Sequence, residues 1–230
     1  MRDAGCVLVT GASRGLGLEF VRQYAHAGYR VLATCRDPGG ATDLQNLPGR
    51  IEIAKLDVTS EDDVDAIVEQ LEDDPVDILI SNAAVLGGPR GRLENLDWAV
   101  WHRVLDVNVI GAVRVAVKLW PNVAASGEKK IVFISSRAGL VRETRPGALY
   151  TYRSSKAALN AAARTLALDL LPRGVIVAML NPGHVRTSIG GKNAPMTPTE
   201  SVTSMRELIA HLDTGHVGRF WHHDGRELPL

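Results

Sequence analysis

The chain has 230 residues, 45% of them hydrophobic and 23% charged, and its 26 basic residues balance its 26 acidic ones. This composition is typical of one globular domain, and the even charge argues against nucleic acid or an anionic membrane as a partner. With two cysteines in short apolar runs and no apolar stretch of about eighteen residues, a disulfide-rich secreted domain and a spanning helix are not expected. A cytoplasmic location is expected instead.

Short apolar runs alternate with helical patterns along the chain. The runs are rich in β-branched residues and predict strands at 6–10, 30–35, 51–55, 78–81, 130–135 and 175–180. Helices are predicted between Gly11 and Gly28, at 41–47, after Ser60, over 98–120 with an end at Pro121, and over 150–171. Beyond 183 the pattern predicts a helix near 200–212 and an edge strand around Phe220.

This alternation determines the expected fold. Parallel strands need crossover connections and are buried on both faces, so strands separated by helices predict an α/β, doubly wound, mostly parallel sheet. No linker, repeat or low-complexity tract divides the chain, and residues 1–230 are expected to form a single domain. The segment 184–200 is rich in glycine and proline, and we expect it to be a mobile substrate loop.

The first strand leads directly into three glycines, Gly11, Gly15 and Gly17, before the first helix. In open α/β sheets, ligands bind beyond the carboxyl ends of the strands, where the strand order reverses. Gly11 permits a tight turn, Gly15 lets backbone N–H groups reach a pyrophosphate, and Gly17 lets the helix pack closely on the sheet. A tight turn without a ligand is the alternative, but the position of the glycines favours a dinucleotide site.

Two arginines indicate which dinucleotide is bound. An NAD site usually has a carboxylate at the end of the second strand, where it accepts from the ribose 2′-hydroxyl. Here that strand ends in Cys35 followed by Arg36, and Arg14 lies in the glycine turn. Guanidinium groups suit a 2′-phosphate, so NADP(H) is preferred over NAD(H), with solvated loop charge as the alternative. Asp57, after the third strand, either accepts from the adenine amino group or caps the next turn.

Tyr152 and Lys156 lie four residues apart at the start of a predicted helix, so their side chains share a face. An ammonium group close to a phenol favours the phenolate, and we expect Lys156 to lower the pKa of Tyr152. Such a phenol can protonate a carbonyl oxygen while a hydride reaches the carbon, or act in reverse on an alcohol. Tyr150 has Ser154 four residues later and is not expected to take part.

Two further polar residues stand where this site needs them. Ser135 and Ser136 end the fifth strand, and Ser136, which lies beyond the apolar run, is the better candidate for a hydrogen bond to the substrate oxygen. Asn108 interrupts an apolar helix and is expected to hold a water that relays protons to Lys156. A hydrogen bond at a strand end or a helix bend is the alternative for each residue.

Several motifs together resemble the short-chain dehydrogenase/reductase family. They are Thr10-Gly-Ala-Ser-Arg-Gly-Leu-Gly17, Asp57-Val58, Asn82-Ala83, Asn108, Ser136, Tyr152-x-x-x-Lys156 and Pro182-Gly-x-Val-x-Thr187. Within the family, Tyr152-Arg-Ser-Ser-Lys-Ala-Ala-Leu-Asn160 and Asp224-Gly-x-x-Leu-Pro229 are similar to the sniffer-like and C-factor-like carbonyl reductases. The resemblance spans nearly the whole chain, with one departure at Ala84, where the family has a glycine.

The resemblance implies a Rossmann-type sheet of about seven strands in the order 3-2-1-4-5-6-7, and a catalytic set of Asn108, Ser136, Tyr152 and Lys156. It also implies that Asn82 supports the central strand, and that the stretch from Pro182 to Thr187 holds the nicotinamide. The predicted cofactor site comprises Gly11, Ser13, Arg14, Gly15, Leu16, Gly17, Arg36, Asp57, Val58, Asn82, Ala83, Tyr152, Lys156, Pro182, Gly183, Val185 and Thr187.

The expected activity is that of an NADPH-dependent oxidoreductase that transfers a hydride between nicotinamide and a carbonyl or alcohol substrate, as a carbonyl reductase does. The alternative is a nucleotide-binding signalling or regulatory protein of the C-factor type. Tyr152 and Lys156 favour catalysis, because a binding role requires neither residue. A sugar-nucleotide epimerase is disfavoured, because its extra substrate domain does not fit after the sixth strand.

The expected partners are a small-molecule substrate and a second copy of the chain. Neighbouring residues on a strand point to opposite faces, so His222 and His223 are not expected to share a metal ion. The helix that carries Tyr152 has a smooth alanine-rich surface on which a homodimer is expected, with a monomer as the alternative. Its alanines are Ala157, Ala158, Ala161, Ala162, Ala163 and Ala167.

Overall fold

Eight strands form one sheet in the computed structural model, which describes residues 5–88, 93–144 and 149–230. They are β1 (Cys6–Thr10), β2 (Arg30–Cys35), β3 (Ile51–Lys55), β4 (Ile78–Ser81), β5 (Lys130–Ile134), β6 (Ile176–Asn181), β7 (Phe220–His222) and β8 (Glu227–Leu228). Their order is β3-β2-β1-β4-β5-β6-β7-β8, and all neighbours are parallel except β7 and β8. The strand order therefore reverses at β1, which lies between β2 and β4.

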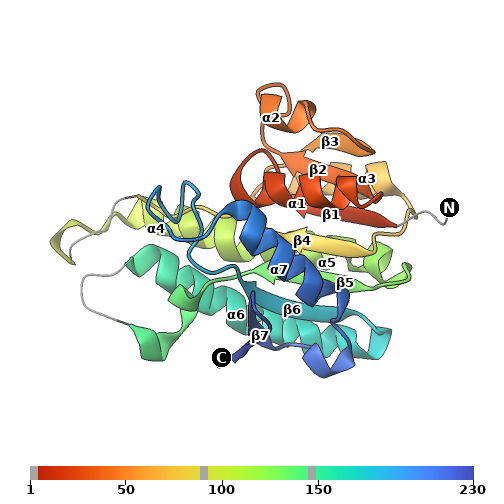
Figure 1. Ribbon diagram of the computed structural model, residues 1–230. Helices are drawn as coiled ribbons and strands as arrows, with labels where there is room; N and C mark the ends of the chain where they lie inside the picture. Colours follow the sequence, from red (N-terminus) through yellow and green to blue (C-terminus); the bar gives the residue numbers. More distant parts are fainter. Residues whose placement is uncertain (1–4, 89–92, 145–148) are drawn as a thin grey trace.

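Helices cover both faces of this sheet (Figure 1). The α-helices in the described part of the chain are α1 (Gly15–His26), α2 (Thr42–Gln45), α3 (Glu61–Leu71), α4 (Trp98–Leu105), α5 (Ala112–Ala124), α6 (Tyr150–Leu170) and α7 (Pro198–Ala210). Helices α1 and α7 pack against each other on one face, while α3, α5 and α6 cover the other. None of the helices in these described ranges is long and apolar enough to span a bilayer.

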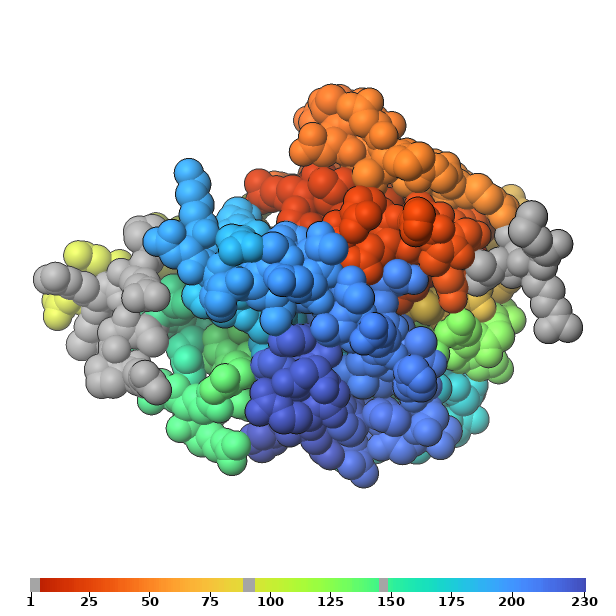
Figure 2. All heavy atoms as spheres, in the orientation of Figure 1, coloured from red at the N-terminus to blue at the C-terminus, as the bar shows by residue number. Residues whose placement is uncertain are grey.

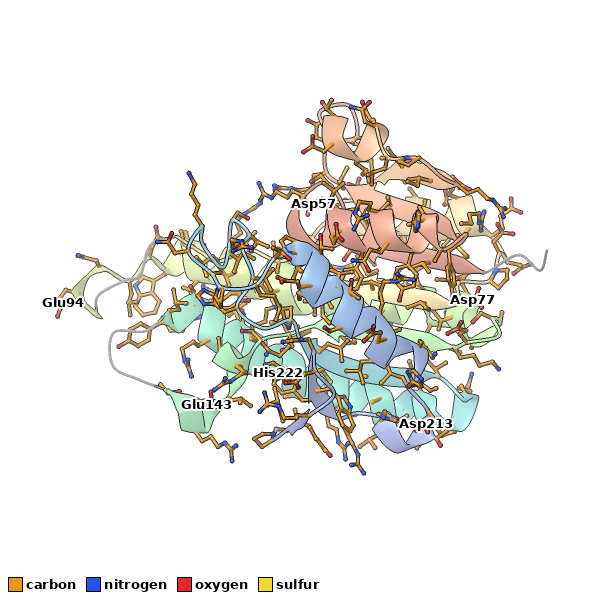
Figure 3. The ribbon with its side chains drawn as sticks, in the orientation of Figure 1. Asp57, Asp77, Glu94, Glu143, Asp213 and His222 are labelled. Carbon is orange, nitrogen blue, oxygen red and sulfur yellow. The ribbon has the colours of Figure 1, made fainter. Side chains whose placement is uncertain are left out.

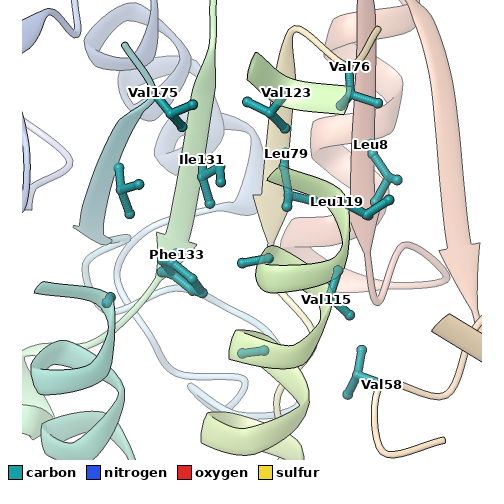
Figure 4. Packing of buried hydrophobic residues seen from close by; sticks show 14 of the residues in the cluster. Leu8, Val58, Val76, Leu79, Val115, Leu119, Val123, Ile131, Phe133 and Val175 are labelled. Atoms are coloured by element: carbon teal, nitrogen blue, oxygen red, sulfur yellow. The ribbon is translucent and has the colours of Figure 1, made fainter. Parts of the chain in front are cut away.

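Alternate residues of each strand enter two separate cores. Val7 and Val9 of β1 face α1, while Leu8 faces the other side of the sheet. There Leu8, Leu79 and Ile131 belong to one buried cluster with Leu119 of α5 (Figure 4). On the opposite face, the blue C-terminal helix region lies against the red N-terminal region (Figure 2). Burial of both faces accounts for the nearly continuous apolar runs of the central strands.

The predicted doubly wound sheet and its strand order are confirmed, with one addition at the C-terminal end. Phe220 was expected on an edge strand, but β7 lies between β6 and β8 and is fully paired. A tight turn at Gly225, which has a φ of +85°, returns the chain as the two-residue strand β8. A strand this short leaves no periodic pattern in the sequence, so β8 was not predicted.

The predicted helix over 98–120 is wrong in two respects. It is divided by a π-helical segment, η2 (Asp106–Gly111), between α4 and α5. Pro121 does not end it, because α5 continues through the proline to Ala124. The apolar face of α5 packs on the sheet core. This packing stabilises the helix by more than the loss of the one backbone hydrogen bond that a proline cannot donate.

The glycine turn after β1 is a close backbone junction. Gly11 has a φ of +66°, which favours glycine. At Gly17 the conformation is ordinary, but a Cβ would overlap the Gly11 carbonyl and lie 2.7 Å from Asn82 Nδ2. Close packing of α1 on the sheet therefore requires the absence of a side chain at position 17, as predicted.

Replacement of Gly17 by alanine should destabilise the protein because the new Cβ would overlap the Gly11 carbonyl oxygen. We expect the G17A variant to lose about 1–3 kcal/mol of unfolding free energy, measured by urea denaturation. The matched control is Gly39→Ala, where the nearest atom to a new Cβ is Asp37 Oδ1 at 3.6 Å. That control should stay within about 0.5 kcal/mol of the wild type. Equal stability of the two variants would contradict the close packing.

Candidate active site

A cavity of about 850 Å³ opens at the carboxyl ends of β1 to β4. The predicted cofactor residues that line it are Gly11, Ser13, Arg14, Gly15, Leu16, Arg36, Asp57, Val58, Asn82, Ala83 and Thr187. Ala84, Leu86, Val107, Ser188 and Ile189 also line it and were not assigned to the cofactor. The predicted residues outside its lining are Gly17, Asn108, Ser136, Tyr152, Lys156, Pro182, Gly183 and Val185.

The N-terminus of α1 borders this cavity. The helix begins at Gly15, and its N-cap residue Arg14 makes no side-chain capping bond to the first-turn N–H groups. Such N–H groups, with the partial positive charge of the helix end, suit a pyrophosphate. Gly15 has a φ of +57°, and a Cβ there would contact the Thr187 methyl group at 3.4 Å. The glycine keeps this cradle open, and the donor set fits the phosphates of a dinucleotide.

Asn82 ties β4 to β1 beneath the cradle. Its Nδ2 donates to the carbonyl oxygens of Thr10 and Gly11 at 2.9 and 3.2 Å. In return, Thr10 Oγ1 accepts from the backbone N–H groups of Asn82 and Ala83, each at 3.0 Å. Asn82 thus supports the central strand as expected, and Thr10 is a partner that the glycine pattern did not reveal.

Charged side chains border the cavity at the ends of β2 and β3. Arg14 and Arg36 line it and are exposed. Asp57 (Figure 3) accepts from Thr59 N and Thr59 Oγ1 at 3.0 and 2.8 Å, so it caps the next turn. Burial raises the pKa of Asp57, but the Thr59 bonds and the positive charges of Arg36 and Arg103 lower it overall. The carboxylate is therefore ionised near neutral pH.

The predicted catalytic side chains gather between the end of β5 and helix α6. Tyr152 and Lys156 are both buried on α6, and Lys156 Nζ lies 5.7 Å from the centre of the Tyr152 ring. Lys156 Nζ donates to the Ile134 carbonyl oxygen at 2.8 Å. The Ser136 side chain hydrogen-bonds Tyr152. The phenol, the ammonium group and the serine hydroxyl therefore form one cluster.

The pKa of Tyr152 shifts in the direction opposite to the one expected. Burial raises the pKa of Tyr152 to about 12, and the bond to Ser136 only partly offsets this. Burial also lowers the pKa of Lys156 to about 8. The sequence shows that a lysine lies one turn away, but it does not show how deeply both groups are buried, and desolvation dominates here. The phenol is therefore protonated near neutral pH.

Asn108 reaches this cluster through a neighbour of Lys156. In the π-helical segment η2, its Oδ1 accepts from Val85 N at 2.8 Å and its Nδ2 donates to Val85 O at 2.9 Å. Nδ2 also donates to Ser155 Oγ at 3.0 Å, and Ser155 Oγ donates to Tyr152 O at 2.8 Å. The observed role of Asn108 is thus to join the β4 loop to α6. A water-mediated relay from Asn108 to Lys156 stays a prediction.

The two serines after β5 have different partners. Ser135 is buried and its hydroxyl donates to Asn160 Oδ1 of α6, whereas Ser136 is partly exposed beside Tyr152. Ser136 Oγ also accepts from Ala138 N at 3.1 Å, which starts the 3₁₀ turn η3 (Arg137–Gly139). Of the two serines, Ser136 is thus the one beside Tyr152, and its hydrogen bond to a substrate oxygen stays a prediction.

A family model described as short chain dehydrogenase matches residues 5–197. The chain belongs to the short-chain dehydrogenase family. C-signal of Myxococcus xanthus is 37% identical over 155 residues, which are 67% of this chain and 93% of that protein.

Solved structures agree with this family assignment. Carbonyl reductase Sniffer of D. melanogaster superposes with a TM-score of 0.91 at 27% identity, over 98% of this chain and 99% of that one. An NADPH-bound carbonyl reductase from chicken fatty liver gives a TM-score of 0.88 at 30% identity, over 98% of each chain. The resemblance predicted from the motifs is confirmed, and this short-chain dehydrogenase has carbonyl reductases among its structural neighbours.

The segment after β6 is closed by its own hydrogen bonds in this short-chain dehydrogenase. Val185 forms a parallel bridge with Met196, and Arg186 N donates to Met196 O at 2.9 Å. Thr187 Oγ1 accepts from Gly190 N at 3.1 Å. Helix α7 begins at Pro198, so the end of the expected mobile segment 184–200 is helical. Motion of the remainder stays a prediction.

The histidine pair at the C-terminal end is arranged differently from the expectation. His222 ends β7, but His223 lies beyond it, so strand alternation does not separate them and their ring centres are 4.3 Å apart. His222 Nδ1 lies 3.0 Å from Asp224 Oδ1. In the part of the chain that the structure describes, no three histidine, cysteine or acidic residues gather as metal ligands.

The buried charge of Lys156 predicts a pH-dependent stability. Below pH 8 the folded protein holds a desolvated ammonium group, whereas the unfolded chain releases its proton only near pH ~10.4. Between these values the unfolded state binds more protons, so the unfolding free energy of the wild type rises with pH. Lys156→Met removes the penalty but leaves the Ile134 carbonyl oxygen without its donor. At pH 7 we expect the variant to be more stable by about 1–3 kcal/mol.

Urea unfolding at pH 7 and pH 10 measures this effect. The advantage of Lys156→Met should shrink at pH 10, where the wild-type amine is largely neutral. Lys192→Met is the control, because Lys192 is exposed and should show no such advantage. A variant that is less stable at pH 7, or an advantage that is equal at both pH values, would contradict the assignment.

Proposed function

We propose that this short-chain dehydrogenase is an NADPH-dependent carbonyl reductase. The observation that carries the proposal is the cluster in which Tyr152 is hydrogen-bonded to Ser136 and Lys156 Nζ lies 5.7 Å from the centre of the Tyr152 ring. This cluster follows β5, beside the strands whose ends form the cavity. The NADPH-bound chicken carbonyl reductase supports the choice of cofactor.

The cavity would hold the nucleotide through three groups of residues. The pyrophosphate would bind the turn from Gly11 to Gly17 and the N-terminus of α1. The 2′-phosphate would pair with Arg14 and Arg36, and the adenine would lie between Val58 and Val107. Thr187, with Pro182, Gly183 and Val185 behind it, would hold the nicotinamide. When bound, this cofactor supplies the hydride.

The residues of the cluster have distinct tasks in the reduction. Tyr152 donates its phenolic proton to the carbonyl oxygen as negative charge develops there. Ser136 hydrogen-bonds the same oxygen and orients it. Lys156, held by the Ile134 carbonyl oxygen, places a positive charge that stabilises the phenolate left on Tyr152. Asn108 and Ser155 keep the first turn of α6 in place.

The protonated state of Tyr152 near neutral pH is the state that carbonyl reduction requires. With a pKa of about 12, the phenol carries the proton that a carbonyl substrate needs. Alcohol oxidation requires the phenolate, which is scarce at neutral pH. We therefore propose aldehydes or ketones as the physiological substrates. The cytoplasm as the location of the protein is likewise a proposal.

Tyr152→Phe removes the proton donor without altering the nucleotide cavity. Turnover of a carbonyl substrate should fall by about 10³-fold or more while NADPH binding survives. Tyr150→Phe is the matched control, because Tyr150 is exposed on the same helix turn and lies against Trp101 rather than Ser136. NADPH oxidation followed at 340 nm with a panel of aldehydes and ketones provides the assay. Substantial activity in Tyr152→Phe would refute the assignment.

The cofactor preference is tested by neutralising both arginines. In the Arg14→Gln, Arg36→Gln double variant, affinity for NADPH should fall by about 2–4 kcal/mol, because the 2′-phosphate loses two charged partners. Affinity for NADH, which lacks that phosphate, should barely change and serves as the internal control. Isothermal titration calorimetry measures both constants. Equal losses for the two cofactors would mean that these arginines do not read the 2′-phosphate.

A signalling or regulatory role is the second candidate function. It is favoured by the 37% identity to C-signal. The two candidates differ in what the wild type does with NADPH. Binding of NADPH without reduction of any carbonyl compound in the panel would favour the regulatory role, whereas turnover that depends on Tyr152 would favour the reductase.

A homodimer through α6 is also a proposal. Ala163 and Ala167 are fully buried in the core, so they are not part of the smooth outer surface that the sequence suggested. Ala161 is exposed, and Ala157, Ala158 and Ala162 are partly exposed. Leu168 of α6 and Val117 of α5 add exposed apolar area. A second copy would cover this narrower surface.

A further inference from the structure

The main chain at Gly183 is enclosed between two side chains from distant parts of the sequence. A Cβ built on Gly183 would lie 3.1 Å from His223 Cδ2, 3.2 Å from His223 Nε2 and 3.4 Å from Met196 Sδ. Gly183 has a φ of +84°, a conformation that favours glycine. The edge of the His223 ring and the Met196 thioether therefore pack directly on the backbone of Gly183.

Gly183 belongs to the segment that leads from β6 to the cavity. Just before it, the carbonyl oxygen of Pro182 accepts from Ser201 Oγ of α7 at 2.7 Å, and Ser201 is fully buried. Four residues after it, Thr187 lines the cavity, and the Thr187 methyl group lies 3.4 Å from the position of a Cβ on Gly15. The position of the main chain at Gly183 therefore bears on the wall of the cavity.

His223 is itself held by the end of β6. Its backbone N–H donates to the carbonyl oxygen of Asn181 at 2.9 Å. The Asn181 side chain is buried, and its Oδ1 accepts from Arg137 N, the residue after Ser136, at 3.1 Å. The His223 ring thus has a defined position relative to Ser136 as well as to Gly183.

The contact between the His223 ring and Gly183 is one of packing. Within residues 5–88, 93–144 and 149–230, Nδ1 of this ring is buried without a hydrogen-bond partner. Burial, together with the neighbouring His222, lowers the pKa of His223, although Asp224 acts in the opposite direction. The ring is therefore mostly neutral near neutral pH. A buried nitrogen without a partner costs stability, so hydrogen bonding of Nδ1 does not account for the place of this ring.

We propose that His223 is a positioning residue for the reduction: its ring fixes the main chain at Gly183, and with it the segment that would hold the nicotinamide, relative to Ser136. This inference rests on the proposed function. A displacement of about 1 Å between reacting groups can lower a rate by about 10²-fold, so support of this segment matters although His223 acts only through the backbone. The adenine half of the cofactor would bind at the glycine turn and would not depend on this contact.

Turnover and binding by the His223→Ala variant test this role. The turnover number for a carbonyl substrate should fall by about 10–100-fold, because the segment loses its support. The dissociation constant of NADPH should rise by about 3–10-fold. The constant of adenosine 2′,5′-bisphosphate, which has the adenine and the 2′-phosphate but no nicotinamide, should stay within about 2-fold of the wild type. Isothermal titration calorimetry measures both constants.

Two further variants separate positioning from a general loss of stability. His223→Phe keeps a flat ring against Gly183 and should restore turnover to within about 2-fold of the wild type. Glu227→Ala removes the 2.9 Å contact of Glu227 with Arg219 on the same β7–β8 hairpin, and it should change neither turnover nor the two constants. Melting temperatures show whether each variant is folded.

Each contrary result has a definite meaning. Wild-type turnover and NADPH affinity in His223→Ala overturn the role of His223 and leave the proposed function intact. Equal losses of affinity for NADPH and for adenosine 2′,5′-bisphosphate mean that the whole site is disturbed, and they also overturn it. A His223→Phe variant that is no more active than His223→Ala does the same. If the wild type binds NADPH but reduces no carbonyl compound, the proposed reductase activity fails, whereas the comparison of the two dissociation constants still tests His223.

Discussion

The pairing of β1 with β4 is the contact on which the rest of this site depends. Asn82 and Thr10 lock the two strands together at their carboxyl ends through four hydrogen bonds. The chain leaves β1 toward one face of the sheet and β4 toward the other, and the cavity opens between these exits. Gly17 packs directly on this junction, so α1 has a defined position. The cradle for a phosphate is thus formed by backbone packing before any charged side chain contributes.

The proposed catalytic cluster places polar groups where stability alone would place apolar ones. Lys156 is fully buried, and its ammonium group donates to the Ile134 carbonyl oxygen. Asn108 is also buried but has partners for both its oxygen and its nitrogen. The two residues therefore have opposite effects on stability. The hydrogen-bonded amide of Asn108 stabilises the helix junction, whereas the desolvated charge of Lys156 destabilises the fold. A group kept despite such a penalty is a strong candidate for a role in chemistry.

The parts of the fold that the sequence predicts are those in which local pattern and packing agree. The five N-terminal strands, α3 with its Ser60 cap, and α6 follow from periodicity and turn residues. Pro121 shows the limit, because its local preference is overridden by the apolar face of α5 on the sheet. In the site, residue types and spacing identify Tyr152, Lys156 and Ser136 as candidates. The pKa of Tyr152 depends on how deeply the folded chain buries it, and no local pattern contains that information.

The net charge likewise does not show where the charged residues lie, and their positions are what matters for binding. Although acidic and basic residues balance over the chain, Arg14 and Arg36 both line one cavity. Directly beyond Asp57, the first turn of α3 carries Glu61, Asp62 and Asp63. A compact anion that fills the cavity meets the arginines and the N-terminus of α1, whereas an extended polyanion would also meet this acidic turn. The local sequence of charges, and not their sum, thus favours a single dinucleotide over a nucleic acid strand.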